Sequence, residues 1–112
     1  MLLVEDDTAS RNALRFLLRR AGWDVEGVMT LAEAIHSVAA NPPVAMVLDL
    51  MLPDGDGLEV LRRIRASGSK ARVAVVSGVG DPDWLKRVEE LKPDAILRKP
   101  IDVNALMRAL GG

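Results

Sequence analysis

The sequence of 112 residues contains no cysteine and no tyrosine, and only one phenylalanine, one histidine and two tryptophans. The absence of cysteine excludes thiol catalysis, cysteine-ligated zinc and disulfide bonds. It also agrees with a cytoplasmic setting, where disulfides are rare. Thiol enzymes and disulfide-stabilised secreted domains are therefore excluded.

A strong net charge and a long apolar run are also missing. The 15 basic and 16 acidic residues leave a net charge of −1, so no large field draws the chain to nucleic acid or anionic lipid. The longest apolar runs, such as Val44–Leu48, are far too short to cross a bilayer. The first four residues lack the basic start and long apolar stretch of a signal peptide. We expect a cytoplasmic domain that binds neither membranes nor nucleic acid directly.

The length and composition of the chain fit one packed domain. The length fits a single domain over residues 1–112, either standing alone or cut from a longer protein. Hydrophobic residues make up 49% of the chain and charged residues 28%, which is typical of soluble globular domains. Neither metal ions nor disulfide bonds are needed to explain folding.

Five short segments rich in aliphatic residues predict five β-strands. We expect them at Leu2–Val4, Trp23–Val28, Val44–Leu48, Arg72–Val76 and Ala95–Leu97. Three of them contain continuous apolar runs instead of alternating ones. Such runs are typical of strands in a parallel sheet with helices on both faces.

Apolar side chains at a spacing of three or four residues predict a helix after each strand. The inward-facing residues are Leu14, Leu17, Leu18 and Ala21; Leu31, Ala34, Ile35 and Val38; Leu58, Leu61 and Ile64; Leu85, Val88 and Leu91; and Leu106 with Leu110. Alternating strands and helices of these lengths predict right-handed crossovers and a doubly wound α/β sheet. Ligands of such sheets bind beyond the carboxyl ends of the strands.

Residues at the helix ends support these boundaries. Gly22 is expected to end the first helix, and the capping box Thr30–Glu33 to begin the second. The third is expected to stop near Ser67–Ser69, and Pro93 to end the fourth. Asp102 is the expected N-cap of the fifth.

Polar residues directly follow four of the predicted strands. The first strand runs into Glu5–Asp7, the third into Asp49, the fourth into Ser77 and the fifth into Lys99. Because parallel strands end at one edge of the sheet, carboxylates meeting there would repel one another unless a cation neutralised them. Oxygen ligands without histidine or cysteine suit Mg²⁺. A lysine and a hydroxyl beside such a site are what the oxygens of a phosphoryl group need.

Taken one at a time, these residues have ordinary explanations. Acidic residues after a strand often cap the next helix, as Asp7 or Thr8 is expected to do. A serine after a strand usually begins a loop, and a lysine before a proline is usually solvated. Their joint position at one sheet edge favours the phosphoryl site over these separate explanations.

The motifs around the strand ends are specific in combination. They are Val4–Asp7 with Arg11 downstream, Val47–Pro53 leading to Asp56 and Gly57, Val75–Gly78, and Leu97–Pro100. Together they resemble the receiver domains of two-component response regulators, and the resemblance covers essentially the whole chain. It implies a flavodoxin-like (βα)5 fold with a five-stranded parallel sheet in the order 2-1-3-4-5. It also implies a signalling switch that is a regulatory domain and not an enzyme.

The resemblance implies a role for each residue at the strand ends. Asp49 would accept a phosphoryl group from a phosphohistidine or a small acyl phosphate. Asp6, Asp49 and the backbone carbonyl of Met51 would ligate Mg²⁺, and Glu5 would reach the metal through water. The phosphoacceptor and the metal site would therefore share Asp49.

Two further residues would act on the phosphoryl group itself. Lys99 and the metal would share the charge of the transferring oxygens, and Ser77 would donate its hydroxyl. The Lys99–Pro100 bond would be cis, as is typical of the family.

The implied partners are a sensor histidine kinase or phosphotransfer protein upstream and an output domain or target protein downstream. A homodimer through the fourth helix, fifth strand and fifth helix is a further implication. Two other classes stay open: a phosphatase of the haloacid-dehalogenase type and an interaction module that never needs phosphate. Such phosphatases carry D-x-D at the nucleophile, whereas Met51 stands two residues past Asp49 here. The interaction module would have no reason to keep the acidic pair, Ser77 and Lys99 complete.

Several positions depart from the family pattern. Ile96 stands where a switch tyrosine or phenylalanine is usual, and Ile101 where a phenylalanine is frequent. Lys92–Pro93 replaces a Gly-Ala turn. Coupling of the Ser77 hydroxyl to a rotating ring is therefore not expected. We expect an intact phosphorylation site joined to a reshaped output surface.

Met51 and Val79 flank the site at positions that influence dephosphorylation in the family. Apolar side chains there hinder the positioning of an attacking water, which predicts a long-lived aspartyl phosphate.

Other features have simpler interpretations. Asp54–Gly57 lacks the remaining ligands of an EF-hand and predicts a tight strand-to-helix loop. His36 is expected on the surface, and Arg62–Arg65 on a solvated face around Ile64. Trp23 and Trp84 are expected to pack at element boundaries.

Overall fold

The computed structural model describes residues 1–78 and 82–111, and side chains within 82–84 lie outside the described part. Five parallel strands form one sheet in the order β2-β1-β3-β6-β7. They are β1 Leu2–Val4, β2 Glu26–Val28, β3 Ala45–Asp49, β6 Arg72–Ser77 and β7 Ala95–Arg98. Because β6 and β7 are the fourth and fifth strands of this sheet along the chain, the predicted order 2-1-3-4-5 is confirmed.

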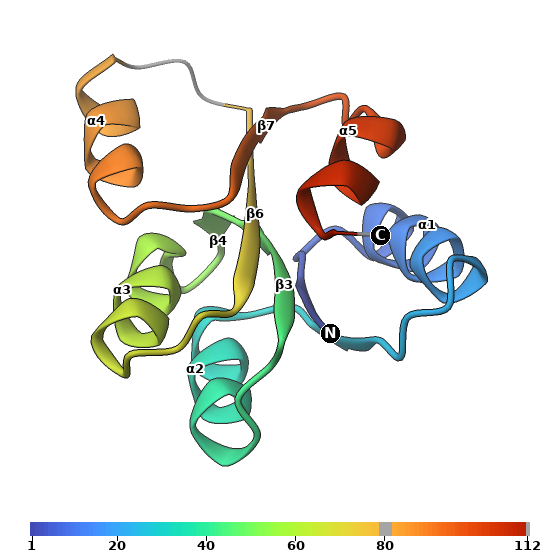
Figure 1. Ribbon diagram of the computed structural model, residues 1–112, viewed down its shortest axis with the longest axis horizontal. Coiled ribbons are helices and arrows are strands. Elements are labelled where there is room, and N and C mark those ends of the chain that lie inside the picture. Colours follow the sequence, from blue (N-terminus) through green and yellow to red (C-terminus); the bar gives the residue numbers. More distant parts are fainter. Residues whose placement is uncertain (79–81, 112) are drawn as a thin grey trace.

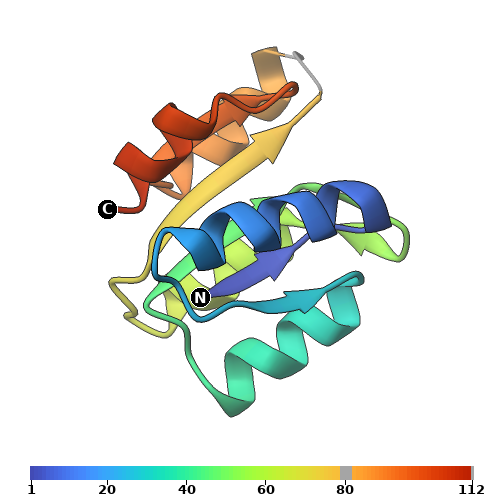
Figure 2. The same cartoon turned by 90° about the vertical axis from the view of Figure 1, so that its right-hand side faces the viewer.

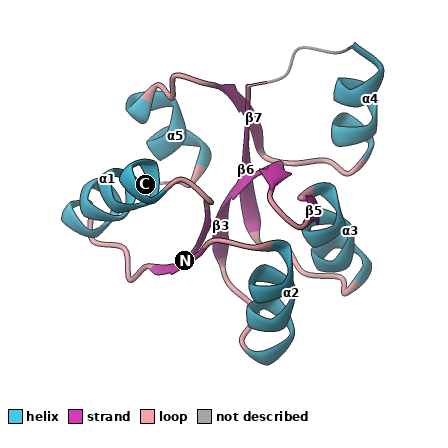
Figure 3. Ribbon diagram, turned by 180° about the vertical axis from the view of Figure 1, so that it is seen from behind, coloured by secondary structure: helices cyan, strands magenta, loops and turns pink. Residues whose placement is uncertain are grey.

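Five helices cover the two faces of this sheet. They are α1 Thr8–Arg20, α2 Leu31–Ala40, α3 Leu58–Ala66, α4 Pro82–Glu90 and α5 Val103–Ala109. Helices α1 and α5 lie on one side, and α2, α3 and α4 on the other (Figures 1 and 3). Figure 2 shows α4 and α5 at one end of the molecule and α2 at the opposite end. The doubly wound architecture is therefore confirmed.

Each face of the sheet has its own apolar core, because side chains of a strand alternate between its faces. Leu2 and Val4 belong to the core beneath α2, α3 and α4, whereas Leu3 belongs to the core beneath α1 and α5. Likewise Leu48 faces the first core and Val47 the second. This division explains the continuous apolar runs of the strands.

The predicted helix ends are largely confirmed by side-chain caps. Asp7 Oδ2 accepts from the Ser10 amide at 2.9 Å, and Thr30 Oγ1 accepts from the Glu33 amide at 3.1 Å. Asp102 caps α5, and Gly22 follows α1 with a φ of +99°. These polar caps satisfy amides that have no partner within their own helices.

Two details of the predicted elements are wrong. The second strand begins at Glu26, because the Trp23 amide still bonds to Leu18 O at 3.0 Å as α1 ends. Leu17 and Ala21 are exposed, and Leu14 and Leu18 alone are the buried residues of α1. The apolar stripe that packs α1 against the sheet is therefore narrower than the predicted one.

A two-stranded antiparallel hairpin, absent from the prediction, lies between β3 and α3. It pairs β4 Met51–Leu52 with β5 Gly55–Asp56. The Asp56 carboxylate accepts from the Leu58 amide at 2.9 Å and so helps to begin α3. Gly57 lies so close to β3 that a Cβ there would meet Asp49 O at 2.7 Å. The tight loop predicted for Asp54–Gly57 is thus confirmed as part of this hairpin.

Arg65 is wrongly predicted as a solvated residue. Its guanidinium donates to the carbonyls of Leu91, Lys92 and Ala71 at 3.2, 2.9 and 3.0 Å. Lys92 follows α4 with a φ of +52°, the left-handed conformation in which helices commonly end. Arg65 therefore ties the end of α4 to α3.

The predictions for His36 and Trp23 are confirmed, and those for Trp84 and Val79 are not covered by the structure. His36 is exposed, and Trp23 packs against the core beneath α1 and α5. The side chain of Trp84 and the whole of Val79 lie outside the described residues. Among the helices that the structure describes, none has the length and apolar character needed to cross a membrane.

Candidate functional site

Three carboxylates meet at the carboxyl ends of β1 and β3. Glu5 and Asp6 follow β1, and Asp49 is the last residue of β3. One carboxylate oxygen from each lies within 4.8 Å of the others. Glu5 and Asp49 are only 2% exposed, whereas Asp6 is open to solvent. The structure therefore brings together the three carboxylates that the sequence analysis placed at the strand ends.

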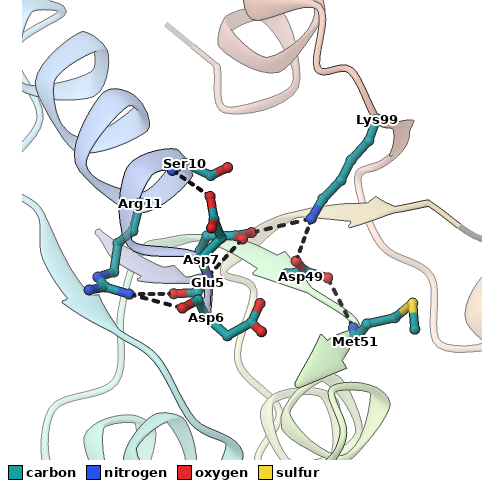
Figure 4. Close-up of polar contacts among 8 residues, drawn as sticks. All are labelled: Glu5, Asp6, Asp7, Ser10, Arg11, Asp49, Met51 and Lys99. Carbon is teal, nitrogen blue, oxygen red and sulfur yellow. Dashed lines mark hydrogen bonds and ion pairs between the residues drawn. The ribbon is translucent and has the colours of Figure 1, made fainter. Parts of the chain in front are cut away.

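Lys99 reaches this group from the end of β7 (Figure 4). Its Nζ lies 2.8 Å from Asp49 Oδ2 and 3.7 Å from Glu5 Oε2. The second oxygen of Asp49 accepts from the Met51 amide at 2.9 Å. Both oxygens of the Asp49 carboxylate therefore have a charged or amide donor.

The environment of Glu5 opposes its negative charge. Burial, followed by the hydrogen bond and negative charge of Asp49, raises the pKa of Glu5 to about 7. The Asp7 amide, 3.2 Å from Glu5 Oε1, and the charge of Lys99 lower the pKa in part. A site that holds two such carboxylates side by side favours an additional positive charge.

Lys99 supplies one such charge. Burial lowers the pKa of Lys99, but the hydrogen bond and charge of Asp49, with the charges of Glu5 and Asp6, outweigh it and raise the pKa above its ordinary value. The ammonium therefore stays protonated through the neutral range.

Arg11 of α1 holds the backbone of the acidic pair. Its Nη1 donates to Glu5 O at 3.0 Å and to Asp6 O at 3.5 Å (Figure 4). The sequence motif contains Arg11 but does not reveal these contacts. Arg11 lies six positions after Glu5 and five after Asp6. Arg11 is thus a positioning residue for the β1–α1 loop.

The ends of β6 and β7 complete the edge. Ser77, the last residue of β6, is buried, and its carbonyl accepts from the Lys99 amide at 3.1 Å. The peptide bond between Lys99 and Pro100 is cis, as expected. Met51 presents its side chain to solvent, with 59% exposed. The six residues predicted for the site therefore lie at the carboxyl ends of the sheet strands or within two residues after them.

The donor set fits a hard divalent cation. Among the residues that the structure describes, the side chains gathered as possible ligands are those of three carboxylates, and Mg²⁺ prefers oxygen ligands. Burial and the neighbouring Asp49 carboxylate raise the pKa of Glu5, so a further positive charge here would stabilise its ionised form. The acidic cluster is therefore suited to hold a divalent cation.

The fold and this edge define a doubly wound α/β domain with an acidic site and one lysine at its strand ends. A model of the response regulator receiver domain matches residues 1–111, and the chain belongs to that family. Its function is accordingly that of a phosphoaccepting switch in two-component signalling, a regulatory role.

Curated relatives agree with this assignment. The chain is 34% identical over 110 residues to the acid tolerance regulatory protein ActR of Rhizobium meliloti (strain 1021), covering 98% of this chain and 57% of that protein. It is 36% identical over 113 residues to the response regulator MprA of Mycobacterium sp. (strain KMS), covering 98% and 49%. The chain therefore spans about half the length of these relatives.

Solved structures share the fold. A response regulator receiver protein from Pseudomonas putida superposes with a TM-score of 0.88 at 30% identity, covering 98% of this chain and 93% of that one. A sensor protein from Polaromonas sp. JS666 is 34% identical with a TM-score of 0.84, covering 98% and 91%. Receiver folds thus occur in proteins described both as regulators and as sensors.

Proposed function

We propose that Asp49 is the phosphoacceptor of this domain and that the reaction requires Mg²⁺. The observation that carries the proposal is the Asp49 carboxylate, 2% exposed at the end of β3 and 2.8 Å from Lys99 Nζ. A carboxylate nucleophile needs its neighbours to neutralise the charge of an incoming phosphoryl group. Lys99 and the acidic cluster, through a bound cation, meet that need.

The proposed residues of the cation site are Glu5, Asp6, Asp49 and the backbone carbonyl of Met51. Bound Mg²⁺ would supply charge neutralisation at the phosphoryl oxygens. The chain's own groups do the remaining work: Lys99 pairs with the phosphoryl oxygens, and the Ser77 hydroxyl donates to the group once it is in place. Arg11 keeps the acidic pair in position through the carbonyls of Glu5 and Asp6.

In the proposed transfer, one bond to phosphorus forms and one breaks. A carboxylate oxygen of Asp49 forms a bond to phosphorus, and the bond between phosphorus and the donor breaks. The donor leaves with that electron pair and takes up a proton if it is a histidine. A phosphohistidine of a sensor kinase or phosphotransfer protein, or a small acyl phosphate, fits this role. Downstream, the phosphorylated domain would act on an output domain or target protein.

The test is incubation with acetyl phosphate and Mg²⁺, followed by intact mass measurement. We expect one phosphate adduct on the unmodified chain and none on Asp49→Asn, which keeps the shape of the side chain. Removal of Mg²⁺ with a chelator should also prevent the adduct. A Glu33→Gln variant, altered at an exposed carboxylate in α2, should be phosphorylated as the unmodified chain is.

Two outcomes would overturn the proposal. An adduct that persists in Asp49→Asn would place the phosphate on another residue. Absence of an adduct with acetyl phosphate and with a phosphohistidine donor would favour an interaction module that works without phosphate. Continuous release of phosphate from an ester substrate, dependent on Asp49, would instead indicate a phosphatase.

A further inference from the structure

The hairpin formed by β4 and β5 begins two residues after Asp49 and is hydrogen-bonded to it. The Met51 amide donates to Asp49 Oδ1 at 2.9 Å, and Met51 is itself the first residue of β4. Such a bond to an ionised carboxylate is stronger than a bond to a neutral oxygen. This hydrogen bond therefore joins the first residue of β4 directly to the Asp49 carboxylate.

The other end of the hairpin holds helix α2. Asp54, in the turn between β4 and β5, accepts from the Leu31 amide at 2.7 Å and from the Ala32 amide at 3.1 Å. These two bonds lower the pKa of Asp54, which shows that they favour its ionised form. Gly55, next to Asp54, also contacts Leu31 closely, since a Cβ there would lie 2.7 Å from Leu31 Cδ2.

The first turn of α2 therefore has two caps of different origin. Thr30 caps the helix locally, accepting from the Glu33 amide at 3.1 Å. Asp54 caps it from a segment more than 20 residues away in the sequence. The local cap belongs to the helix alone, whereas Asp54 connects the helix to the phosphorylation site. This difference provides a matched pair of residues for an experiment.

At the β7 edge of the sheet, fewer contacts could carry a change at Asp49 to a helix. Ile96 in β7 packs against the core beneath α2, α3 and α4 and carries neither a ring nor a hydroxyl. Arg65 fastens the end of α4 through bonds to the carbonyls of Leu91 and Lys92. The contacts of Arg65 thus restrain this end. In contrast, Asp49 is joined to α2 by the hydrogen bond to Met51, the backbone of the hairpin and the hydrogen bonds of Asp54.

We propose that phosphorylation of Asp49 is transmitted through the β4–β5 hairpin and Asp54 to α2, which forms the responding surface of this domain. The proposal rests on Asp49 being the phosphoacceptor. When an Asp49 oxygen bonds to phosphorus and the donor leaves with its electron pair, the carboxylate loses its charge on both oxygens. The Met51 amide then no longer bonds to an ionised carboxylate oxygen, because the negative charge now lies on the phosphoryl oxygens. The amide adjusts to this change of acceptor, and β4 moves with it.

The experiment follows backbone amide NMR shifts with and without excess acetyl phosphate, with Mg²⁺ present in every sample and intact mass measured on each. Three chains are compared: the unmodified chain, Asp54→Ala and Thr30→Ala. Both substitutions remove a cap from the same helix turn, so they cost similar stability. Only Asp54→Ala removes the link to the hairpin.

We expect phosphorylation to shift the amides of residues 33–40 in the unmodified chain and in Thr30→Ala. In Asp54→Ala the adduct should form, amides of 50–56 should still shift, and those of 33–40 should stay at their unphosphorylated positions. An Asp54→Asn variant, which keeps one acceptor oxygen, should give a reduced shift. Circular dichroism of each variant checks that α2 is retained.

The outcomes separate the two proposals. If no chain gains phosphate, the phosphoacceptor assignment fails. If phosphate is gained but residues 33–40 do not shift in the unmodified chain, transmission to α2 is wrong while the acceptor stands. Equal shifts in Asp54→Ala and Thr30→Ala would likewise overturn the role of Asp54.

Discussion

Glu5 is a buried carboxyl group whose surroundings oppose its ionisation. Burial and the neighbouring Asp49 raise its pKa to about 7. A divalent cation requires the ionised form, so binding must displace the proton that Glu5 holds below pH 7. Cation affinity and the protonation of this one residue are therefore linked.

This linkage predicts a pH-dependent affinity for Mg²⁺. One unit below its pKa the carboxyl is largely protonated, so affinity should fall by up to about tenfold from pH 8 to pH 6. Calorimetric titration in two buffers of different ionisation heat measures both the affinity and the proton released. In Glu5→Gln the affinity should be nearly independent of pH over this range. An unmodified chain with equal affinity at pH 6 and pH 8 would contradict the prediction.

Met51 lies two residues after Asp49, the proposed phosphoacceptor. Its apolar side chain, mostly exposed beside the site, cannot orient a water by hydrogen bonding. We predict that Met51→Asn shortens the lifetime of the phosphate adduct several-fold, because an amide side chain can position an attacking water. Intact mass after removal of acetyl phosphate gives the lifetime.

The control for this prediction is Met29→Asn, since Met29 is also an exposed methionine. The adduct on Met29→Asn should last as long as on the unmodified chain. A lifetime unaffected by Met51→Asn would show that water access is limited elsewhere.

At the scale of elements, helix α4 is held at its end by a side chain of another helix. Arg65 of α3 donates to three backbone carbonyls and lies 3.5 Å from the Asp94 carboxylate. Asp94 in turn accepts from the Val73 amide at 2.7 Å, which joins the turn before β7 to β6. The α4–β7 connection thus depends on one guanidinium and one carboxylate.

Arg65→Ala should therefore lower the free energy of unfolding by about 2 kcal/mol, because several backbone carbonyls lose a charged donor. Arg62→Ala is the matched control on the same helix. The Arg62 side chain is 47% exposed and pairs with Glu59 at 3.5 Å, so its loss should change stability by less than about 0.5 kcal/mol. Urea unfolding followed by circular dichroism measures both. If both substitutions lowered the free energy of unfolding equally, the bonds from Arg65 to the backbone carbonyls would not be specifically stabilising.

Comparison of sequence and structure shows which elements could be predicted. Strands and helices with strong apolar periodicity were placed to within a few residues, and the acidic site followed from where the strands end. The role of Arg65 at the end of α4 and the contact of Asp54 with α2 cannot be predicted from local sequence, because Leu91 and Leu31 lie more than 20 residues from them. The β4–β5 hairpin was missed since each strand has two residues, too few for any period. Local patterns predict elements, but not the polar contacts that join them.

The same limit applies to the start of β2. Trp23 and Val25 are bulky residues that favour a strand, yet the structure uses 23–25 to leave α1. The Trp23 amide completes the end of the helix by bonding to Leu18 O. Intrinsic preference was overridden there by the need to satisfy a helix carbonyl.

At the scale of the whole molecule, one sheet separates two cores and belongs to both. Neighbouring residues of β6 demonstrate the division: Val75 faces the core beneath α2, α3 and α4, and Val76 faces the core beneath α1 and α5. Neither core can lose its packing without exposing a face of the shared strands. The two cores should therefore unfold as a single cooperative unit, as small domains generally do.

Ile64→Val tests this cooperativity from one side of the sheet. Loss of one buried methylene beneath α3 should cost about 1 kcal/mol and lower the urea midpoint without changing the slope. The methyl NMR signals of Val75 and Val76 should disappear at the same lowered urea concentration. Val44→Ala, at a position 74% exposed, should leave both midpoints unchanged. If Val75 were lost before Val76 in Ile64→Val, the faces would be separate folding units, and a change in α2 would not need to reach α1 or α5 at all.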